Sequence, residues 1–233
     1  MAHQLNRLAD KETLASALAD RVSAALAEGI AARGKASIAV SGGSTPKAFF
    51  KALSTRSIDW SRVTVTLVDE RFVPPDSERS NHALVRDNLL QNAAAAAEFV
   101  PLYHAGGDAA HSAALASEAV AAIGYPFDVA ILGMGNDGHT ASFFPGGDRL
   151  AEALSMKTPR GVITMEAEGA GETRLTLTFS ALQDARLLVL HIEGQQKMDV
   201  LEQALAGGDE HGPFPIGIVL ENVPGTVEIF WAP

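Results

Sequence analysis

The chain of 233 residues contains no cysteine, which excludes disulfides, thiolate nucleophiles and Cys-ligated zinc. Basic residues are also scarce, with 18 Lys and Arg against 28 Asp and Glu and a formal net charge of −10. Binding to nucleic acid or to an anionic membrane relies on a basic surface, so we expect neither as a partner. An anionic substrate would therefore need a local basic pocket.

Long apolar runs are missing too. None approaches the length that spans a bilayer, and residues 1–14 lack the apolar core of a signal peptide, so we expect a cytoplasmic protein. What is present is typical of a globular protein, with 47% hydrophobic and 20% charged residues. We expect a single domain over residues 1–233.

Apolar residues recur at helical spacing between Asp10, a suitable N-cap, and Gly34, a suitable stop. The pattern predicts further helices over about 46–53, 80–91, 108–123 and 194–206, and strands over 36–41, 63–69, 127–132, 161–166, 174–179, 186–192 and 226–231. Strands that alternate with helices predict an α/β protein with three layers, α/β/α. The sheet is expected to be Rossmann-like and mostly parallel, with helices on both faces.

Polar clusters follow three of these strands, at 41–45, 69–71 and 135–139. Open α/β sheets bind ligands outside the carboxyl ends of their strands, so the three clusters are expected to line one pocket. The first, Ser-Gly-Gly-Ser-Thr before Pro46, suits a phosphate at a helix N-terminus, although an ordinary strand-to-helix turn explains it equally well. It is not a Walker A sequence.

In the second cluster, Asp69 is placed to act as a general base or to orient one, and Arg71 could bind an anion or a developing oxyanion. The alternative is a solvated turn with weak ion pairs. Arg174 and Lys197, taken alone, are ordinary surface cations. Lys197 is nevertheless unusual, because a cation in the first turn of a helix is disfavoured unless an anion neutralises it.

The third cluster lies in AILGMGNDGHTASFFPG, residues 130–146, which has the G-x-G-x-x-G spelling of a dinucleotide-binding loop. Such a loop should run directly into a helix, with an acidic residue about 20 positions on at the next strand end. Neither requirement is well met. Asp137 and His139 instead favour water activation and oxyanion binding, because a histidine exchanges protons near neutral pH. A structural histidine is the alternative.

Taken together, SGGSTP, VDERFVP with SN ten residues later, ILGMGNDGHTASFFPG and EGQQK resemble the bacterial 6-phosphogluconolactonases. The resemblance implies hydrolysis of 6-phosphoglucono-1,5-lactone to 6-phosphogluconate in the oxidative pentose phosphate pathway, without a metal or organic cofactor. The implied partner is that small phosphosugar lactone, and a monomer is favoured. Phe143 stands where lactonases more often have Leu.

The resemblance also implies roles for individual residues. His139 matches the general base, Asp137 and Asp69 its supporting acids, and Arg71 a substrate contact. The remaining residues match the phosphate site: Ser41, Gly42, Gly43, Ser44 and Thr45 as its turn, Arg174 and Lys197 as its basic partners. Which of the two aspartates pairs with His139 stays open.

Three other functions compete with this one. A glucosamine-6-phosphate isomerase/deaminase would carry a Glu five residues past the histidine, where this chain has Phe144. A non-catalytic sugar-phosphate sensor would need an effector module, for which there is no room, and would have no use for His139 with two aspartates. A dinucleotide-dependent oxidoreductase is least favoured, because the loop at residues 130–146 does not meet the two requirements of a dinucleotide-binding loop.

Overall fold

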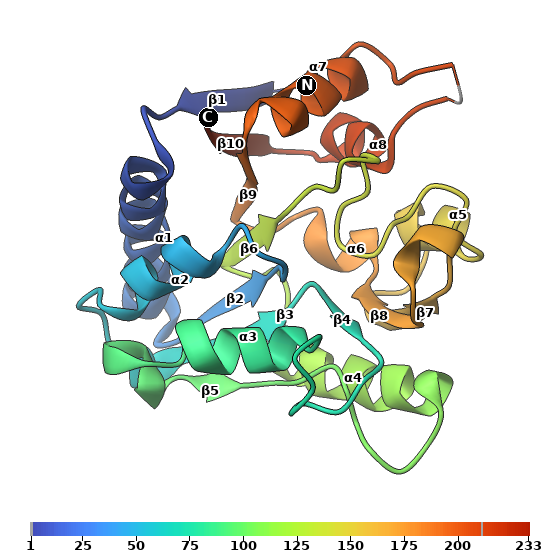
Figure 1. Cartoon of the computed structure of the whole chain (residues 1–233). Helices are drawn as coiled ribbons and strands as arrows, with labels where there is room; N and C mark the ends of the chain where they lie inside the picture. Colours follow the sequence, from blue (N-terminus) through green and yellow to red (C-terminus); the bar gives the residue numbers. More distant parts are fainter. Residues whose placement is uncertain (1, 211) are drawn as a thin grey trace.

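The computed structural model describes residues 2–210 and 212–233, and its centre is a parallel sheet (Figure 1). Over these residues the sheet has seven strands in the order β1-β10-β9-β6-β2-β3-β5. The strands are β1 (Ala2–Arg7), β2 (Ala36–Val40), β3 (Val63–Leu67), β5 (Glu98–Phe99), β6 (Val129–Leu132), β9 (Leu187–Glu193) and β10 (Thr226–Ala232). Each neighbouring pair is parallel.

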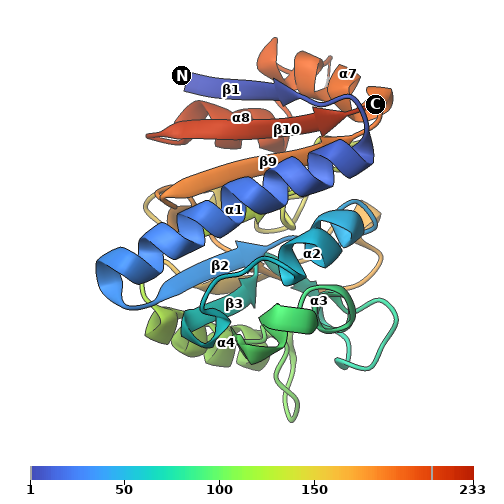
Figure 2. The same ribbon diagram turned by 90° about the vertical axis from the view of Figure 1, so that its left-hand side faces the viewer.

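Helices cover both faces of this sheet, as the sequence predicts (Figures 1 and 2). One face carries α1 (Lys11–Arg33), α2 (Lys47–Ser54) and α3 (Asn81–Asn88). The other carries α4 (Ala109–Ile123), α6 (Phe179–Leu182) and α8 (Pro215–Asn222). The remaining helices are α5 (Leu150–Leu154) and α7 (Gln195–Leu205). The three-layer prediction is confirmed. No helix in the described part of the chain is long and apolar enough to cross a bilayer.

Local sequence signals explain where several helices begin and end. Asp10 caps α1 by accepting a hydrogen bond from the Thr13 amide at 2.7 Å, and Gly34 ends that helix with φ +77°. Ser80 caps α3 through the Ala83 amide. The predicted extension of α3 to residue 91 is wrong, because the chain leaves the α-helix after Asn88 and residues 92–96 form a 3₁₀ turn.

A second, antiparallel sheet has no counterpart in the sequence prediction. It consists of β4 (Asp69–Arg71), β8 (Arg174–Leu177) and β7 (Val162–Met165) in the order β4-β8-β7. The strand predicted over 63–69 is in fact divided, since β3 ends at Leu67 and the chain passes through Val68 into the other sheet. As a result, Arg71 lies directly opposite Arg174 in the β4–β8 register.

The central strands are buried on both faces, which explains their continuous apolar sequences. Every residue of β2 and of β6 is buried, and the phenylalanines Phe49 and Phe50 of α2 pack into the same core. The carboxyl ends of β2, β6 and β9 therefore meet at one edge of a rigid sheet. The three polar clusters emerge at that edge.

Candidate active site

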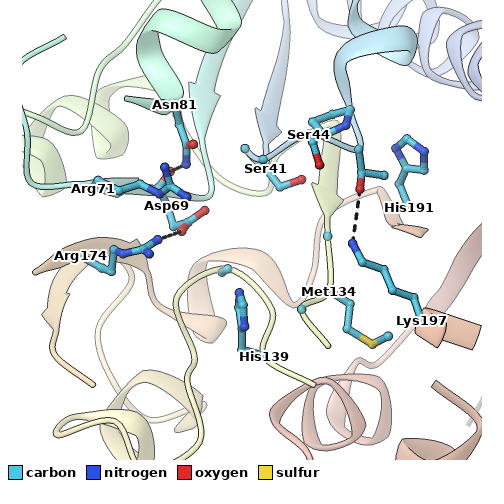
Figure 3. Close-up of a pocket in the computed structure, with 17 residues that line it drawn as sticks. Ser41, Ser44, Asp69, Arg71, Asn81, Met134, His139, Arg174, His191 and Lys197 are labelled. Carbon is cyan, nitrogen blue, oxygen red and sulfur yellow. Dashed lines mark hydrogen bonds and ion pairs between the residues drawn. The ribbon is translucent and has the colours of Figure 1, made fainter. Parts of the chain in front are cut away.

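A cavity of about 220 Å³ opens at the carboxyl edge of the parallel strands (Figure 3). Except for Asp137, all site residues predicted from the sequence line it: Ser41, Gly42, Gly43, Ser44, Thr45, Asp69, Arg71, His139, Arg174 and Lys197. The structure therefore brings together side chains from the turn that follows β2, from β4, β8 and α7, and from the 133–147 loop. The prediction that the polar clusters share one pocket is confirmed.

His139 points into the cavity (Figure 3), and its ring contacts the Asp137 carboxylate. Its Nδ1 lies 2.6 Å from Asp137 Oδ1, and its backbone amide donates to the same oxygen at 3.2 Å. Burial raises the pKa of Asp137, but these hydrogen bonds outweigh it, so that pKa lies below its ordinary value. An ionised Asp137 assigns the proton to Nδ1 and leaves the Nε2 lone pair free as a base.

Two glycines of the G-x-G-x-x-G sequence create the space for this pair. A Cβ on Gly135 would lie 2.3 Å from His139 Nδ1 and 2.5 Å from Asp137 Oδ1. Gly138 has φ +74°, and its Cβ would lie 2.7 Å from Phe214 of the segment before α8. The spacing of these glycines thus serves a His–Asp pair and a tight turn, and does not require a dinucleotide.

Asp69 is buried at the start of β4 and has partners other than His139. Its Oδ2 accepts a hydrogen bond from Ser142 Oγ at 2.6 Å and lies 3.9 Å from Arg174 Nη1. Its main-chain oxygen accepts a hydrogen bond from the side-chain Nδ2 of Asn81 at 2.9 Å. Between the two aspartates, it is therefore Asp137 that hydrogen-bonds the imidazole.

Arg71 and Arg174 face each other across β4 and β8, an arrangement that costs energy unless an anion lies between the two charges. Arg71 Nη1 donates to the Arg79 carbonyl at 2.5 Å, and Arg174 Nη2 donates to the Ala170 carbonyl at 2.7 Å. Both Nε atoms are buried without a partner. Burial lowers the pKa of Arg174, although Asp69 opposes this. The pair can bind an anionic group at this end of the cavity.

The opposite end of the cavity combines two helix N-termini with an ammonium group. Neither α2, preceded by Pro46, nor α7, preceded by Gly194, has a side-chain cap. Lys197 Nζ donates to Thr45 Oγ1 at 3.3 Å, which joins the two helix starts (Figure 3). Burial lowers the pKa of Lys197, and the nearby Glu193 opposes this. Free amides and a desolvated ammonium form a suitable site for a phosphate.

Sequence reasoning missed several residues of the site. His191 of β9 is 2% exposed and lines the cavity, with its Nε2 3.4 Å from Glu193 Oε1. The sequence signal for His191 is only that a polar residue interrupts an apolar strand. Asn81 fits so closely over Gly42 that a Cβ there would lie 1.8 Å from its Oδ1.

Glu70, between Asp69 and Arg71, is completely buried and points away from the cavity into the start of α3. It accepts hydrogen bonds from Ser80 Oγ and from the amides of Arg71, Asn81 and His82, at 2.7–2.9 Å. Burial raises its pKa, and the hydrogen bonds partly oppose this. Glu70 anchors α3 against β4 and thereby fixes Asn81.

The comparison with protein families agrees with this geometry. Residues 9–231 match the family model of glucosamine-6-phosphate isomerases/6-phosphogluconolactonase. The chain belongs to this family. It is 63% identical over the full length of both chains to a 6-phosphogluconolactonase of Rhizobium meliloti (strain 1021). It is 50% identical to a 6-phosphogluconolactonase of Mesorhizobium japonicum, over all of this chain and 96% of the relative.

A solved structure of the family agrees closely with the fold. A 6-phosphogluconolactonase from Shewanella baltica OS155 superposes with a TM-score of 0.94 at 41% identity, covering 99% of this chain and 98% of that one. Within this family, Phe144 is informative, because it is 3% exposed and packs on the His139 ring. An apolar side chain at this position cannot act as the second acid–base group of a deaminase.

No group of three or more His, Asp or Glu side chains among residues 2–210 and 212–233 is arranged to hold a metal ion.

Proposed function

We propose that this chain hydrolyses 6-phospho-D-glucono-1,5-lactone to 6-phospho-D-gluconate, the lactonase step of the oxidative pentose phosphate pathway. The observation that carries the proposal is the division of one cavity into two ends. A His139–Asp137 pair stands near two arginines at one end, and Lys197 joins two helix N-termini at the other. A phosphorylated lactone has complementary chemistry, with a dianion at one end and an ester carbonyl at the other.

In the mechanism that we infer, the turn 41–45 and Lys197 hold the substrate phosphate. His139 Nε2 takes a proton from water, and the hydroxide attacks the C1 carbonyl carbon. Arg71 and Arg174 stabilise the oxyanion that forms there. The tetrahedral intermediate then collapses, the bond between C1 and the ring oxygen breaks, and the imidazolium returns its proton to that oxygen. Acid–base help of this kind contributes a factor on the order of 10² to 10⁴.

Asp137 and Asp69 have separate tasks in this scheme. Asp137 holds the neutral imidazole in the Nδ1–H tautomer and stabilises the imidazolium after proton transfer. Asp69 fixes the position of Arg174 and, through its carbonyl, of Asn81. The family resemblance implied a place for Arg174 in the phosphate site, but its contacts with Asp69 and Phe144 favour the reacting end.

Further parts of the proposal concern the whole protein. We propose that residues 1–233 form one domain, since one family model spans residues 9–231. We further propose that it acts in the cytoplasm, where phosphorylated sugars are metabolised, as the monomer that the family resemblance favours. The proposed partner is the phosphosugar lactone, with no organic cofactor, because each step above is performed by side chains and water.

The phosphate end is tested by comparing 6-phosphogluconolactone with unphosphorylated gluconolactone. Replacement of Lys197 by alanine should raise KM for the phosphorylated substrate about tenfold or more with little change in kcat, since it removes ground-state binding. The KM for the unphosphorylated lactone should change little in this variant. Lys35→Ala, an exposed lysine at the other end of the sheet, is the control. An unchanged KM in the Lys197 variant would exclude a phosphate contact.

A further inference from the structure

Phe144 is a buried aromatic side chain that packs behind the reacting end, against His139 and Arg174, and the mechanism above gives it no role. It is 3% exposed and lies in the same 133–147 loop as His139. Its backbone is tightly held, because its carbonyl accepts a hydrogen bond from the Gly147 amide at 3.0 Å and the preceding Phe143 amide bonds the Thr140 carbonyl at 2.9 Å. The ring therefore has a fixed place in the site.

The first contact of this ring is with the proposed base. The ring centroids of Phe144 and His139 are 4.3 Å apart with an interplanar angle of 32°, so the imidazole packs in a tilted arrangement against the phenyl ring. The hydrogen bond from Nδ1 to Asp137 is a single contact at one edge of the imidazole, and without a second support the ring can tilt away from the carboxylate. An aromatic ring packed against the imidazole prevents that tilt and keeps Nε2 directed into the cavity.

The second contact is with Arg174. The guanidinium carbon of Arg174 lies 5.2 Å from the centroid of the same ring, a cation–π distance. The hydrogen bond to the Ala170 carbonyl fixes one side of this guanidinium, and Asp69 lies 3.9 Å from another nitrogen. One phenyl ring thus touches both the base and a cation that faces the reacting carbonyl.

We propose that Phe144 is a positioning residue that sets the orientation of His139 and its spacing from Arg174. The expected loss of kcat rests on the proposed lactonase function, whereas the expected effect on the orientation of His139 does not. Because water attack needs a base aligned to a fraction of an ångström, loss of this support should lower kcat and leave phosphate binding unchanged. The negative face of the ring also favours the imidazolium that forms during the reaction.

The structure offers a matched pair of variants for the test. Phe144→Leu removes the ring and keeps an apolar side chain. Phe143→Leu makes the same change one residue away, at a side chain that is 0% exposed and packs into the core. Both variants lose similar packing, so a difference between them reports the contacts with His139 and Arg174. Phe144→Tyr keeps the ring and should restore much of what Phe144→Leu loses.

Two readouts are needed, one of them without substrate. In ¹⁵N spectra of the histidine side chains, with His139→Gln used to assign the signals, wild type and Phe143→Leu should show neutral His139 as the Nδ1–H tautomer. Phe144→Leu should show a mixture of tautomers, because the imidazole tilts away from Asp137. If neutral His139 in Phe144→Leu were still the Nδ1–H tautomer alone, the inference would be overturned, whether or not the chain proves to be a lactonase.

The kinetic readout uses hydrolysis of 6-phosphogluconolactone. Phe144→Leu should lose kcat by about tenfold to a hundredfold with KM within about twofold of wild type, and Phe143→Leu should stay near wild type. Equal kcat in the two leucine variants would overturn the inference. A wild type without activity would instead contradict the proposed function, and the spectra would still decide the role of Phe144.

Discussion

At the scale of the single residue, Gly135 shows how little space surrounds the proposed base. Its missing side chain leaves room for the His139 ring and for the Asp137 carboxylate, both of which would lie within 2.5 Å of a Cβ. Its backbone does not need a positive φ, so alanine is compatible with the main chain itself. The demand for glycine therefore comes from the neighbouring side chains.

Gly135→Ala should consequently separate activity from folding. The added methyl group displaces His139 or Asp137, and we expect kcat to fall by at least about 10² because the base loses its orientation. Thermal unfolding should change little, since the imidazole can move into the cavity. Gly169→Ala is the control, at a glycine whose Cβ would meet nothing within 4 Å. A fully active Gly135→Ala enzyme would show that the His–Asp contact is dispensable.

Individual residues also show where sequence reasoning ends. His139, Asp137 and Lys197 could be singled out because motifs or unfavourable helix positions drew attention to them. His191 and Ser142 could not, because a histidine within an apolar strand and a serine within a loop have many structural uses. Only the fold places His191 beside the cavity and the Ser142 hydroxyl on Asp69.

At the scale of the element, α3 and β4 form one unit around Glu70. The carboxylate accepts hydrogen bonds from the start of α3 and from the Arg71 amide, and so connects the helix to the strand that carries Asp69 and Arg71. This short strand could not be predicted, because three polar residues show no apolar alternation. Likewise β1, AHQLNR, has the composition of a loop and forms a strand only because β10 offers its edge.

Glu70→Gln should test this unit. An amide presents two donors to a site made almost entirely of donors, so at least one buried group loses its partner at a cost of about 1–3 kcal/mol in the free energy of unfolding. Because the substitution loosens the contact between α3, which carries Asn81, and β4, which carries Arg71, kcat/KM should fall as well. Glu98→Gln, on the exposed strand β5, should alter neither quantity appreciably. Wild-type stability in Glu70→Gln would show that the carboxylate charge is not needed there.

At the scale of the whole molecule, the edge of the sheet opposite the cavity is held together by a cluster of ion pairs around Asp128. The periodicity of the sequence was enough to predict this parallel architecture and its functional edge. At the amino edge, Asp128 before β6 is buried, pairs with Arg33 of α1, and accepts a hydrogen bond from the Ser37 amide of β2 at 2.8 Å. Arg186, before β9, lies 3.6 Å from the same carboxylate. Asp128 therefore connects four elements.

Asp128→Ala should destabilise the protein without changing its chemistry. Loss of the acceptor leaves a buried amide and two arginines without their partner, and we expect a cost of roughly 2–4 kcal/mol in denaturant unfolding. At temperatures where the variant is folded, kcat/KM should equal that of wild type. Asp87→Ala, which breaks an exposed pair with Arg86, should cost less than about 1 kcal/mol. A lowered kcat/KM in folded Asp128→Ala would mean that the two ends are coupled.

Hydrolysis kinetics decide whether His139 activates water on a phosphorylated lactone. Acid release from freshly generated 6-phosphogluconolactone is followed for wild type and His139→Ala against the spontaneous rate, together with the affinity of each for 6-phosphogluconate. We expect strong acceleration by wild type, a collapse of kcat in the variant and nearly equal affinities. A variant that keeps most of its kcat, or a wild type no faster than the spontaneous reaction, would contradict it.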